Sequence, residues 1–429
     1  MTNQKPKVAI IGAGLAGLTC ANVLKENGIS FNIYEASPQI GGRVKTFQEQ
    51  GFLLDYGFQV MLKAYPECRR FLDYDALRLK KFIPGASVLV DGRFETVGDP
   101  FRRPWDVIKT VFSKVGNFDD KFKVLKLRKM VLSQSIEEIF EKTPPQTTLA
   151  FLQKHGFSEQ MIERFFRPFL GGIFLEKGLK TDASFFLFVF KMFSEGDTAV
   201  PEEGMAAIPK QLAAGFKKSI FLNHPVRSIE NQKITLENGT EVEADYIVLA
   251  TDMEQAQKLL KVSPSKVAEA KNNSVHCFYF KTPKAPINSP LLLLNGSGKG
   301  IINNVVVNSL LSSKYAPEGE HLVGVSVIGK ANPDEAVDQI LAELRKDWFG
   351  EEVEAWTLIK DYYIHNALPA MPSENPPHRH KQAYFEGIPQ NCLVCGDFMA
   401  DPSINGAMYS GRIVAEKISA ELKQTVAAS

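Results

Sequence analysis

The sequence predicts an α/β fold in which a Rossmann-type dinucleotide-binding domain (GxGxxG) is interleaved with a substrate domain of mixed sheet plus helices. A strand, a glycine-rich turn and a helix at residues 8–24 predict the first of these domains. A second stretch typical of a nucleotide site, residues 393–412, lies near the other end of the 429-residue chain. Two such segments so far apart indicate one cofactor site that is assembled from both ends of the chain.

The first element is an almost wholly apolar run at residues 8–11, as expected for a buried parallel strand, and residues 15–24 have helical spacing of apolar side chains. Gly12 and Gly14 lie in the turn between the strand and the helix, and Gly17 lies in the first turn of the helix. The first glycine permits the tight turn, the second lets backbone approach a pyrophosphate, and the third allows close packing of helix on strand. An anion would bind at the helix N-terminus, near Leu15 and Ala16, where N–H groups are unpaired.

Glu35 follows a second predicted strand and lies about 20 residues past the glycines, so its carboxylate can accept hydrogen bonds from ribose hydroxyls. An acidic residue there disfavours a 2′-phosphate, and therefore NADP. The next residues assigned to the cofactor are Ala36, Gly41, Gly42 and Arg43. The glycine doublet again brings bare backbone to a phosphate, and the arginine can supply charge. Simple NAD dehydrogenases lack this doublet, so the stretch favours FAD.

These stretches resemble the flavin-containing amine oxidase superfamily, which includes monoamine oxidases, protoporphyrinogen oxidases and phytoene-desaturase-like enzymes. The resemblance is specific near the two ends of the chain and looser between them, and it implies FAD as the cofactor. It further implies that the isoalloxazine lies near Gly57, Phe58 and Gln59, and the adenine near Val226. It also implies contacts with the ribityl, pyrophosphate and pyrimidine groups from Gly396, Asp397, Ser403, Ile404, Asn405 and Ala407.

The chain organisation is predicted to be interleaved. Residues 233–242 alternate polar and apolar side chains around an Asn-Gly turn, which predicts a hairpin, and another buried strand follows at residues 246–250. We therefore expect this part of the chain to return to the cofactor domain. The expected division is an FAD-binding domain of residues 1–75, 200–260 and 386–429, a substrate domain of residues 76–110 and 261–385, and a helical subdomain of residues 111–199 with a membrane-facing surface as one interpretation.

The formal net charge of +1 gives no overall attraction to nucleic acid. Residues 102–129 nevertheless combine many basic side chains with apolar ones, which suits either an anionic membrane surface or a solvated amphipathic helix packed on its own core. No run approaches about 20 uncharged apolar residues, and residues 1–7 lead straight into the first strand rather than forming a signal peptide. We expect a cytoplasmic protein, and peripheral contact with the inner membrane surface stays open.

Neither a disulfide nor a metal site is expected. Cys392 and Cys395 form a CxxC motif, but in a strand residues three apart point to opposite faces. His378 and His380 are an isolated pair in a proline-rich loop, without the clustered ligands that zinc requires.

Residues 157–193 are rich in phenylalanine, most of which we interpret as core. Within them, residues 167–174 resemble a stretch that borders the active cavity of protoporphyrinogen oxidases and desaturases, and an apolar lining would suit an apolar small molecule. Amine oxidases of the superfamily place an aromatic ring just before the terminal Gly-Ala. Here Ser403 and Ile404 occupy that place, so we expect no aromatic cage.

The resulting hypothesis is an FAD-dependent oxidoreductase that transfers a hydride from an apolar substrate to flavin N5, desaturating an isoprenoid-, carotenoid- or tetrapyrrole-like compound. An electron acceptor, which is oxygen, a quinone or another compound, would complete the cycle. The alternatives are a flavin amine oxidase and a redox-neutral flavin isomerase or non-catalytic flavin-binding protein. No His/Asp pair identifies a catalytic base, and the residues expected to line the cavity are Tyr56, Gln59, Tyr363, His365 and Tyr409.

Overall fold

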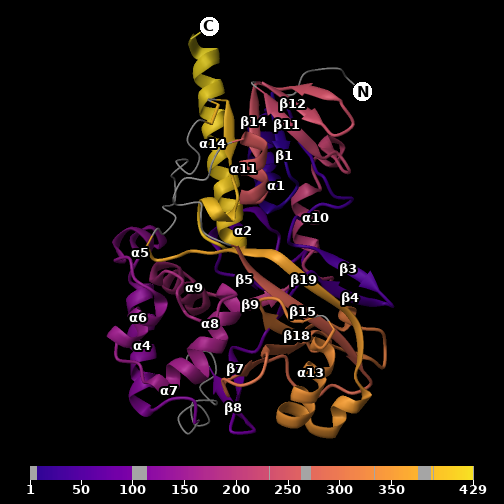
Figure 1. Ribbon diagram of the computed structural model, residues 1–429. Helices are drawn as coiled ribbons and strands as arrows, with labels where there is room; N and C mark the ends of the chain where they lie inside the picture. Colours follow the sequence, from indigo (N-terminus) through magenta and orange to yellow (C-terminus); the bar gives the residue numbers. More distant parts are fainter. Residues whose placement is uncertain are drawn as a thin grey trace.

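A parallel five-stranded sheet lies at the centre of the upper lobe in Figure 1. The computed structural model describes residues 7–98, 114–230, 232–261, 272–332, 334–374, 388–389 and 391–428. The sheet has the order β10-β2-β1-β14-β20, and each neighbouring pair is parallel. Its strands are β1 (Val8–Ile11), β2 (Phe31–Tyr34), β10 (Ile220–Phe221), β14 (Tyr246–Leu249) and β20 (Cys392–Val394). Strands from both ends of the chain therefore share one sheet.

Both faces of this sheet are covered, which explains why β1 is apolar throughout. Val8 and Ile10 join the core beneath α1 (Leu15–Glu26) and α14 (Ile404–Ala428). Ala9 and its neighbours on the other face pack against a small antiparallel sheet and a helix. These are β11 (Val226–Glu230), β12 (Lys233–Leu236), β13 (Glu241–Glu243) and α11 (Met253–Leu260). The predicted first strand and the predicted hairpin are both confirmed.

The lower part of the molecule is built on a mixed seven-stranded sheet of order β19-β15-β18-β17-β16-β7-β8. Its pairs are antiparallel except β16 with β7. The strands are β7 (Gly85–Val90), β8 (Arg93–Gly98), β15 (Asn272–Thr282), β16 (Leu292–Asn295), β17 (Ile302–Val307), β18 (His321–Ile328) and β19 (Thr357–Pro369). Helix α13 (Ala336–Glu343) and the irregular turns after it cover one face. The predicted α/β class with an interleaved mixed-sheet domain is confirmed, whereas the residue boundaries proposed between domains stay a prediction.

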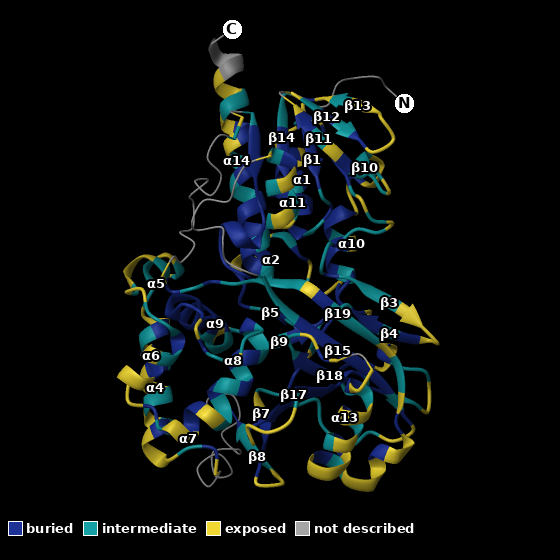
Figure 2. Cartoon of the chain, in the orientation of Figure 1, coloured by how far each residue is buried: buried dark blue, intermediate teal, exposed yellow. Residues whose placement is uncertain are grey.

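A cluster of helices lies beside this sheet, with α9 (Ala183–Glu195) largely buried at its centre (Figure 2). Its other members are α4 (Phe118–Leu132), α5 (Ile136–Lys142), α6 (Thr148–Lys154), α7 (Glu159–Met161), a π turn (Ile162–Phe166) and α8 (Arg167–Phe174). Helices α4 and α5 each begin with a capping box, in which Asn117 or Ser135 and an acidic residue three positions later satisfy otherwise unpaired N–H groups. Short connecting elements are α2 (Pro66–Phe71), α10 (Ala207–Ala213), α12 (Asn308–Leu311), β3 (Thr46–Glu49), β4 (Phe52–Asp55), β5 (Met61–Leu62), β6 (Lys80–Lys81) and β9 (Thr198–Val200).

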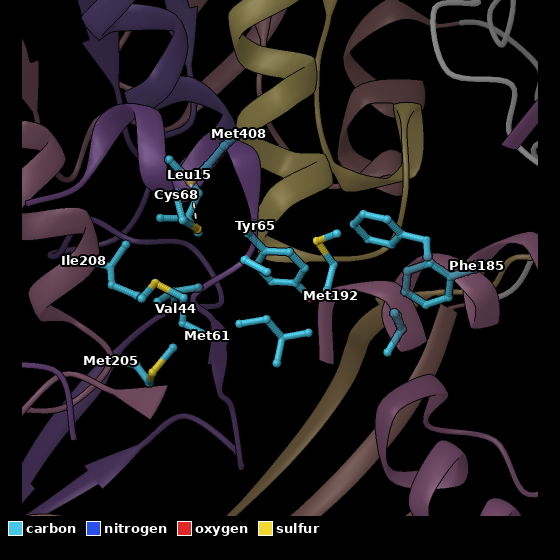
Figure 3. Close-up of a cluster of buried hydrophobic side chains, with 14 of the residues drawn as sticks. Leu15, Val44, Met61, Tyr65, Cys68, Phe185, Met192, Met205, Ile208 and Met408 are labelled. Atoms are coloured by element: carbon cyan, nitrogen blue, oxygen red, sulfur yellow. Dashed lines mark hydrogen bonds between the residues drawn. The ribbon is translucent and has the colours of Figure 1, made fainter. Parts of the chain in front are cut away.

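The lobes meet in one apolar core (Figure 3). Leu15 of α1, Met408 of α14 and Tyr65 before α2 lie near Phe185 and Met192 of α9 in this view. All five side chains are buried, so the cofactor sheet and the helical cluster share a common interior. Burial of this kind fixes the position of α9 relative to the glycine-rich turn.

The five cysteines are free and buried. Cys392 belongs to the core on one face of the parallel sheet and Cys395 to the core on the other, so the expectation of no disulfide is confirmed. Burial raises the pKa of Cys392 to about 11 and that of Cys395 to about 12. His378 and His380 lie outside the described residues, and within those residues no His, Cys, Asp or Glu cluster could hold a metal ion.

Candidate active site

A cavity of about 1040 Å³ runs from the glycine-rich turn to the helical cluster. One end is lined by backbone from the turns after β1 and β2. The other end is lined by phenylalanine side chains from the π turn, α8 and α9. The sites that the sequence predicts for the cofactor and for an apolar molecule are therefore parts of one continuous space.

Glycines line the cofactor end of the cavity. Gly12 has φ +104°, and a Cβ there would lie 2.6 Å from the carbonyl oxygen of Ala250. Gly14 faces Gly42, where a Cβ would lie 3.2 Å from the Gly14 Cα. The backbone N–H of Gly41 donates to Ala13 O at 2.8 Å and holds the two loops together. The result is a cradle of bare backbone, as a pyrophosphate requires.

Gly17 does not line the cavity. A Cβ on it would lie 2.1 Å from the carbonyl oxygen of Gly12, so its hydrogen atom is what lets α1 pack on the turn. Leu15 and Ala16, at the start of α1, do line the cavity.

Glu35 lines the cavity at the end of β2. Its Oε2 accepts a hydrogen bond from Ala13 N at 2.7 Å and its Oε1 accepts one from Ser37 N at 2.9 Å. Each carboxylate oxygen has a second lone pair, so both remain able to accept from ribose hydroxyls. Ala36 lies beside it, and Val226 lines the same part of the cavity.

An ion pair joins the two ends of the chain at the cavity wall. Arg43 Nη2 donates to Asp397 Oδ1 at 2.6 Å, and Arg43 Nη1 donates to Ala367 O at 3.0 Å. Burial disfavours the charged guanidinium, but the charge and hydrogen bond of Asp397, together with the charge of Asp252, leave the pKa of Arg43 raised. Arg43 therefore stays cationic beside the glycine cradle, where it can balance an anion.

Gln59 has an unsatisfied oxygen beside the cavity. Its Nε2 donates to Arg43 O at 2.9 Å and to Tyr56 O at 3.2 Å. Its Oε1 is buried and has no hydrogen-bond partner among the described residues. Such an atom costs free energy unless a bound group donates to it. Together with the cradle, this oxygen fits a flavin dinucleotide, and the neighbouring Gly57 and Phe58 also line the cavity.

The C-terminal segment contributes the stretch before α14 and one face of the first turn of that helix. Gly396, Asp397, Ser403, Ile404 and Ala407 line the cavity.

Asn405, also assigned to the cofactor from sequence, does not line it. This residue is 1% exposed, and its Oδ1 accepts from Glu67 N at 3.1 Å on another side of the helix. Helix phase explains the correction, because Asn405 lies about 100° around the axis from Ile404.

Four of the five expected cavity residues line the cavity: Tyr56, Gln59, Tyr363 and His365. Tyr363 and His365 stand two residues apart on β19, with 3.3 Å between the Tyr363 hydroxyl and His365 Nδ1. The fifth, Tyr409, does not line the cavity, which corrects the prediction. It lies on another side of α14 than Ala407, and its ring contacts Arg412, whose guanidinium carbon is 5.0 Å from the ring centroid.

We call the phenylalanine-lined end of the cavity the aromatic arm. Its ring contacts include Phe165 with Phe169 at 5.2 Å and Phe169 with Phe193 at 5.3 Å between centroids. Phe174 and Phe188 lie in the core without lining the cavity, so fewer of this cluster belong to the core alone than the sequence predicts. The phenylalanines that line the arm are Phe165, Phe166, Phe169, Phe185, Phe186, Phe190 and Phe193.

Several lining residues were not found from the sequence. Thr251 and Asp252 follow β14, and the signal for them was available, because the carboxyl ends of neighbouring parallel strands meet at one edge. Asn304 of β17 and Arg128 of α4 also line the cavity. No local sequence pattern marks these two, since only the packing of α4 and the seven-stranded sheet brings them to the arm.

The sequence matches the family model described as flavin containing amine oxidoreductase over residues 15–419. The chain belongs to this family. FAD is therefore the cofactor of the cradle, and the protein is a flavin-dependent oxidoreductase by family.

Among curated relatives, protoporphyrinogen oxidase 2 of Arabidopsis thaliana is 29% identical over 167 residues, which cover 39% of this chain and 32% of that protein. The L-amino acid oxidase bordonein-L of Crotalus durissus terrificus is 23% identical over 284 residues, covering 60% and 53%. The chain thus spans between a third and about half of these relatives. Wild-type putrescine oxidase bound to putrescine has a TM-score of 0.73 at 17% identity, covering 97% of this chain and 99% of that one, so the two share the fold.

Proposed function

We propose that this protein oxidises an apolar small molecule that lies in the aromatic arm, an isoprenoid-, carotenoid- or tetrapyrrole-like compound. The observation that supports this most is the continuity of the cavity between the glycine cradle and the phenylalanine side chains. When bound, FAD supplies a two-electron acceptor, taking a hydride at N5 from a substrate C–H bond. A proton would leave the neighbouring substrate atom, which would become doubly bonded to the oxidised carbon, and oxygen, a quinone or another acceptor would take up the two electrons.

The residues of the chain would position the substrate and manage this proton. Phenylalanine rings exclude water and hold an apolar chain or ring system in place by shape. Tyr363 and His365 are the titratable pair at the cavity that can receive or relay the proton. Gln59 and Arg43 would hold the cofactor rather than react.

A polar amine is disfavoured by the charge distribution. The acidic side chains among the described lining residues are Glu35, Asp252 and Asp397, all at the cofactor end of the cavity. An ammonium group in the arm would lose its water without meeting a carboxylate, which costs several kcal/mol. Ser403 and Ile404 also stand where an amine oxidase would place an aromatic ring. The redox-neutral isomerase remains the second alternative, since it would use the same cavity.

The proposal includes peripheral contact of a cytoplasmic protein with the inner face of a membrane. A molecule that fills the aromatic arm partitions into lipid rather than water. The described residues contain no helix that is long and apolar enough to cross a bilayer. Substrate would then reach the cavity from a surface-bound state.

Anaerobic titration of the FAD-loaded protein tests the proposed chemistry. Visible flavin absorbance is followed while a lipid extract and a pool of polar amines are added separately. We expect bleaching by the lipid fraction and none by the amines. Bleaching by amines alone would overturn the proposal in favour of amine oxidation, and bleaching by neither would overturn it in favour of a redox-neutral or scaffold role.

A further inference from the structure

Helix α4 exposes an apolar stripe. Among the described residues, the exposed large apolar side chains are Phe118 (61% exposed), Phe122 (49%), Leu125 (36%) and Leu132 (41%), and all four lie on this one helix. Their spacing of four, three and seven residues keeps them within about 40° of one direction around the helix axis. Exposed segments along α4 are visible in Figure 2. The stripe contains one charged residue, Lys129, whereas the solvated face of a helix is mostly charged or polar.

Lys129 lies within the stripe, about 20° around the helix axis from Phe118, and Lys126 lies at its edge, about 80° from Phe118. Lys126 and Lys129 are exposed and form no ion pair with a described residue. The acidic residues of the helix are already engaged: Asp119 pairs with Lys123, and Asp120 accepts from Asn117 N and the Ser158 hydroxyl. Apolar side chains with lysines beside them match the interface of an anionic bilayer, where the lysines meet lipid phosphates.

A neighbouring side of α4 forms part of the cavity wall. Val124 and Arg128 line the cavity, while Leu127 and Val131 are buried in the helical cluster. Arg128 Nη2 donates to Ser194 O at 3.2 Å and fastens α4 to the end of α9. The lining residues Arg128 and Val124 lie about 75° and 115° around the axis from the centre of the stripe. The exposed stripe and the aromatic arm therefore lie on adjacent sides of one helix.

We propose that α4 docks on an anionic lipid bilayer, with Phe118, Phe122, Leu125 and Leu132 inserted among the acyl chains. An apolar substrate then enters the aromatic arm beside α4 without crossing water. The delivery of substrate rests on the proposed function, whereas docking itself needs no turnover. A lipid surface fits better than a protein partner, because a stripe about 21 Å long and one helix wide is small beside the ~800 Å² that each partner of a stable protein interface buries.

Flotation with vesicles tests the docking directly. The FAD-loaded protein is mixed with phosphatidylcholine vesicles that contain or lack phosphatidylglycerol. We expect binding to the anionic vesicles, a loss of roughly tenfold or more in affinity for Phe122→Gln/Leu125→Gln, and a comparable loss for Lys126→Gln/Lys129→Gln. The matched control, Lys217→Gln/Lys218→Gln, removes two exposed lysines from the cofactor lobe and should bind like wild type. Flavin absorbance and circular dichroism show whether each variant is folded.

The outcomes separate docking from chemistry. A wild-type protein that does not float with anionic vesicles, or a folded Phe122→Gln/Leu125→Gln variant that floats as well as wild type, would overturn the docking. Self-association that the same variant abolishes in analytical ultracentrifugation, without vesicle binding, would reassign the stripe to a second copy of the chain. Vesicle binding without flavin bleaching by lipid would leave the docking intact and contradict only the proposed oxidation.

Discussion

The two ends of the cavity have walls of different kinds. At the cofactor end, Gly12, Gly14 and Gly42 present backbone, and a single added carbon at Gly42 would approach the opposite loop to 3.2 Å. At the other end, phenylalanine side chains such as Phe169 and Phe193 form the wall. A site made of backbone tolerates almost no change in sequence, whereas a site made of apolar side chains tolerates exchange of one for another. We therefore expect the first end to set the cofactor and, under the proposed function, the second to set the substrate.

The largest effect is expected at Gly17. In Gly17→Ala the new Cβ meets the Gly12 carbonyl oxygen at 2.1 Å, so α1 must shift away from the turn. We expect the free energy of unfolding to fall by about 3 kcal/mol and bound flavin to be lost. Urea titration measures the free energy of unfolding, and visible absorbance of the purified protein measures the flavin content. Gly28→Ala is the control, because Gly28 has φ +68° but a Cβ there would meet no atom within 4 Å. This variant should lose about 1 kcal/mol of unfolding free energy and retain its flavin. Equal effects would contradict a close-packed cradle.

The next effect is expected at Glu35. Glu35→Ala removes the acceptor of the Ala13 and Ser37 N–H groups, and with it the acceptor that we expect the ribose hydroxyls to use. We expect FAD binding to weaken by about 2 kcal/mol, or roughly thirtyfold. Equilibrium dialysis with FAD gives the affinity, and the exposed Glu26→Gln on α1 should leave it unchanged. An unchanged affinity in Glu35→Ala would remove this residue from the cofactor site.

A smaller effect, on the affinity for substrate rather than for the cofactor, is expected in the aromatic arm. Phe169→Ala/Phe193→Ala should keep flavin content but raise the half-saturating concentration of a bleaching lipid about tenfold, because the substrate loses apolar contact area. Phe349→Ala is the control, because it removes a ring that packs on Phe94 away from the cavity. This variant should leave the half-saturating concentration unchanged. Loss of flavin from the double variant would show that the two ends of the cavity are not separable.

The smallest effect is expected from the thiols. Burial raises the pKa of Cys392 to about 11, so that about a thousandth of it is thiolate at pH 8. Cys395 is more strongly shifted. We expect native protein to resist aromatic disulfide reagents and to keep its flavin, with the five thiols reacting only after unfolding. Rapid reaction of the native protein with the reagent would contradict the burial of these thiols in and after β20.

The cofactor end was predictable because its signals are local. The glycines, Glu35 and the hairpin each depend on short-range backbone geometry, which a few residues specify. The α14 contacts were predicted only in part. The resemblance implied Asn405, and Tyr409 was a cavity candidate, but the phase of the helix turns both away from the cavity. The arm was least predictable. Asn304 and Arg128 reach it through packing between elements far apart in the chain, which no local pattern encodes.

The central claim, that one cavity joins the cofactor to an apolar substrate site, is tested most directly by difference spectra of the bound flavin. A saturated hydrocarbon that resists oxidation is titrated into the FAD-loaded protein, and a diamine is titrated in parallel. We predict a saturable spectral shift with the hydrocarbon that weakens in Phe169→Ala/Phe193→Ala, and none with the diamine. A shift with the diamine alone would contradict the claim.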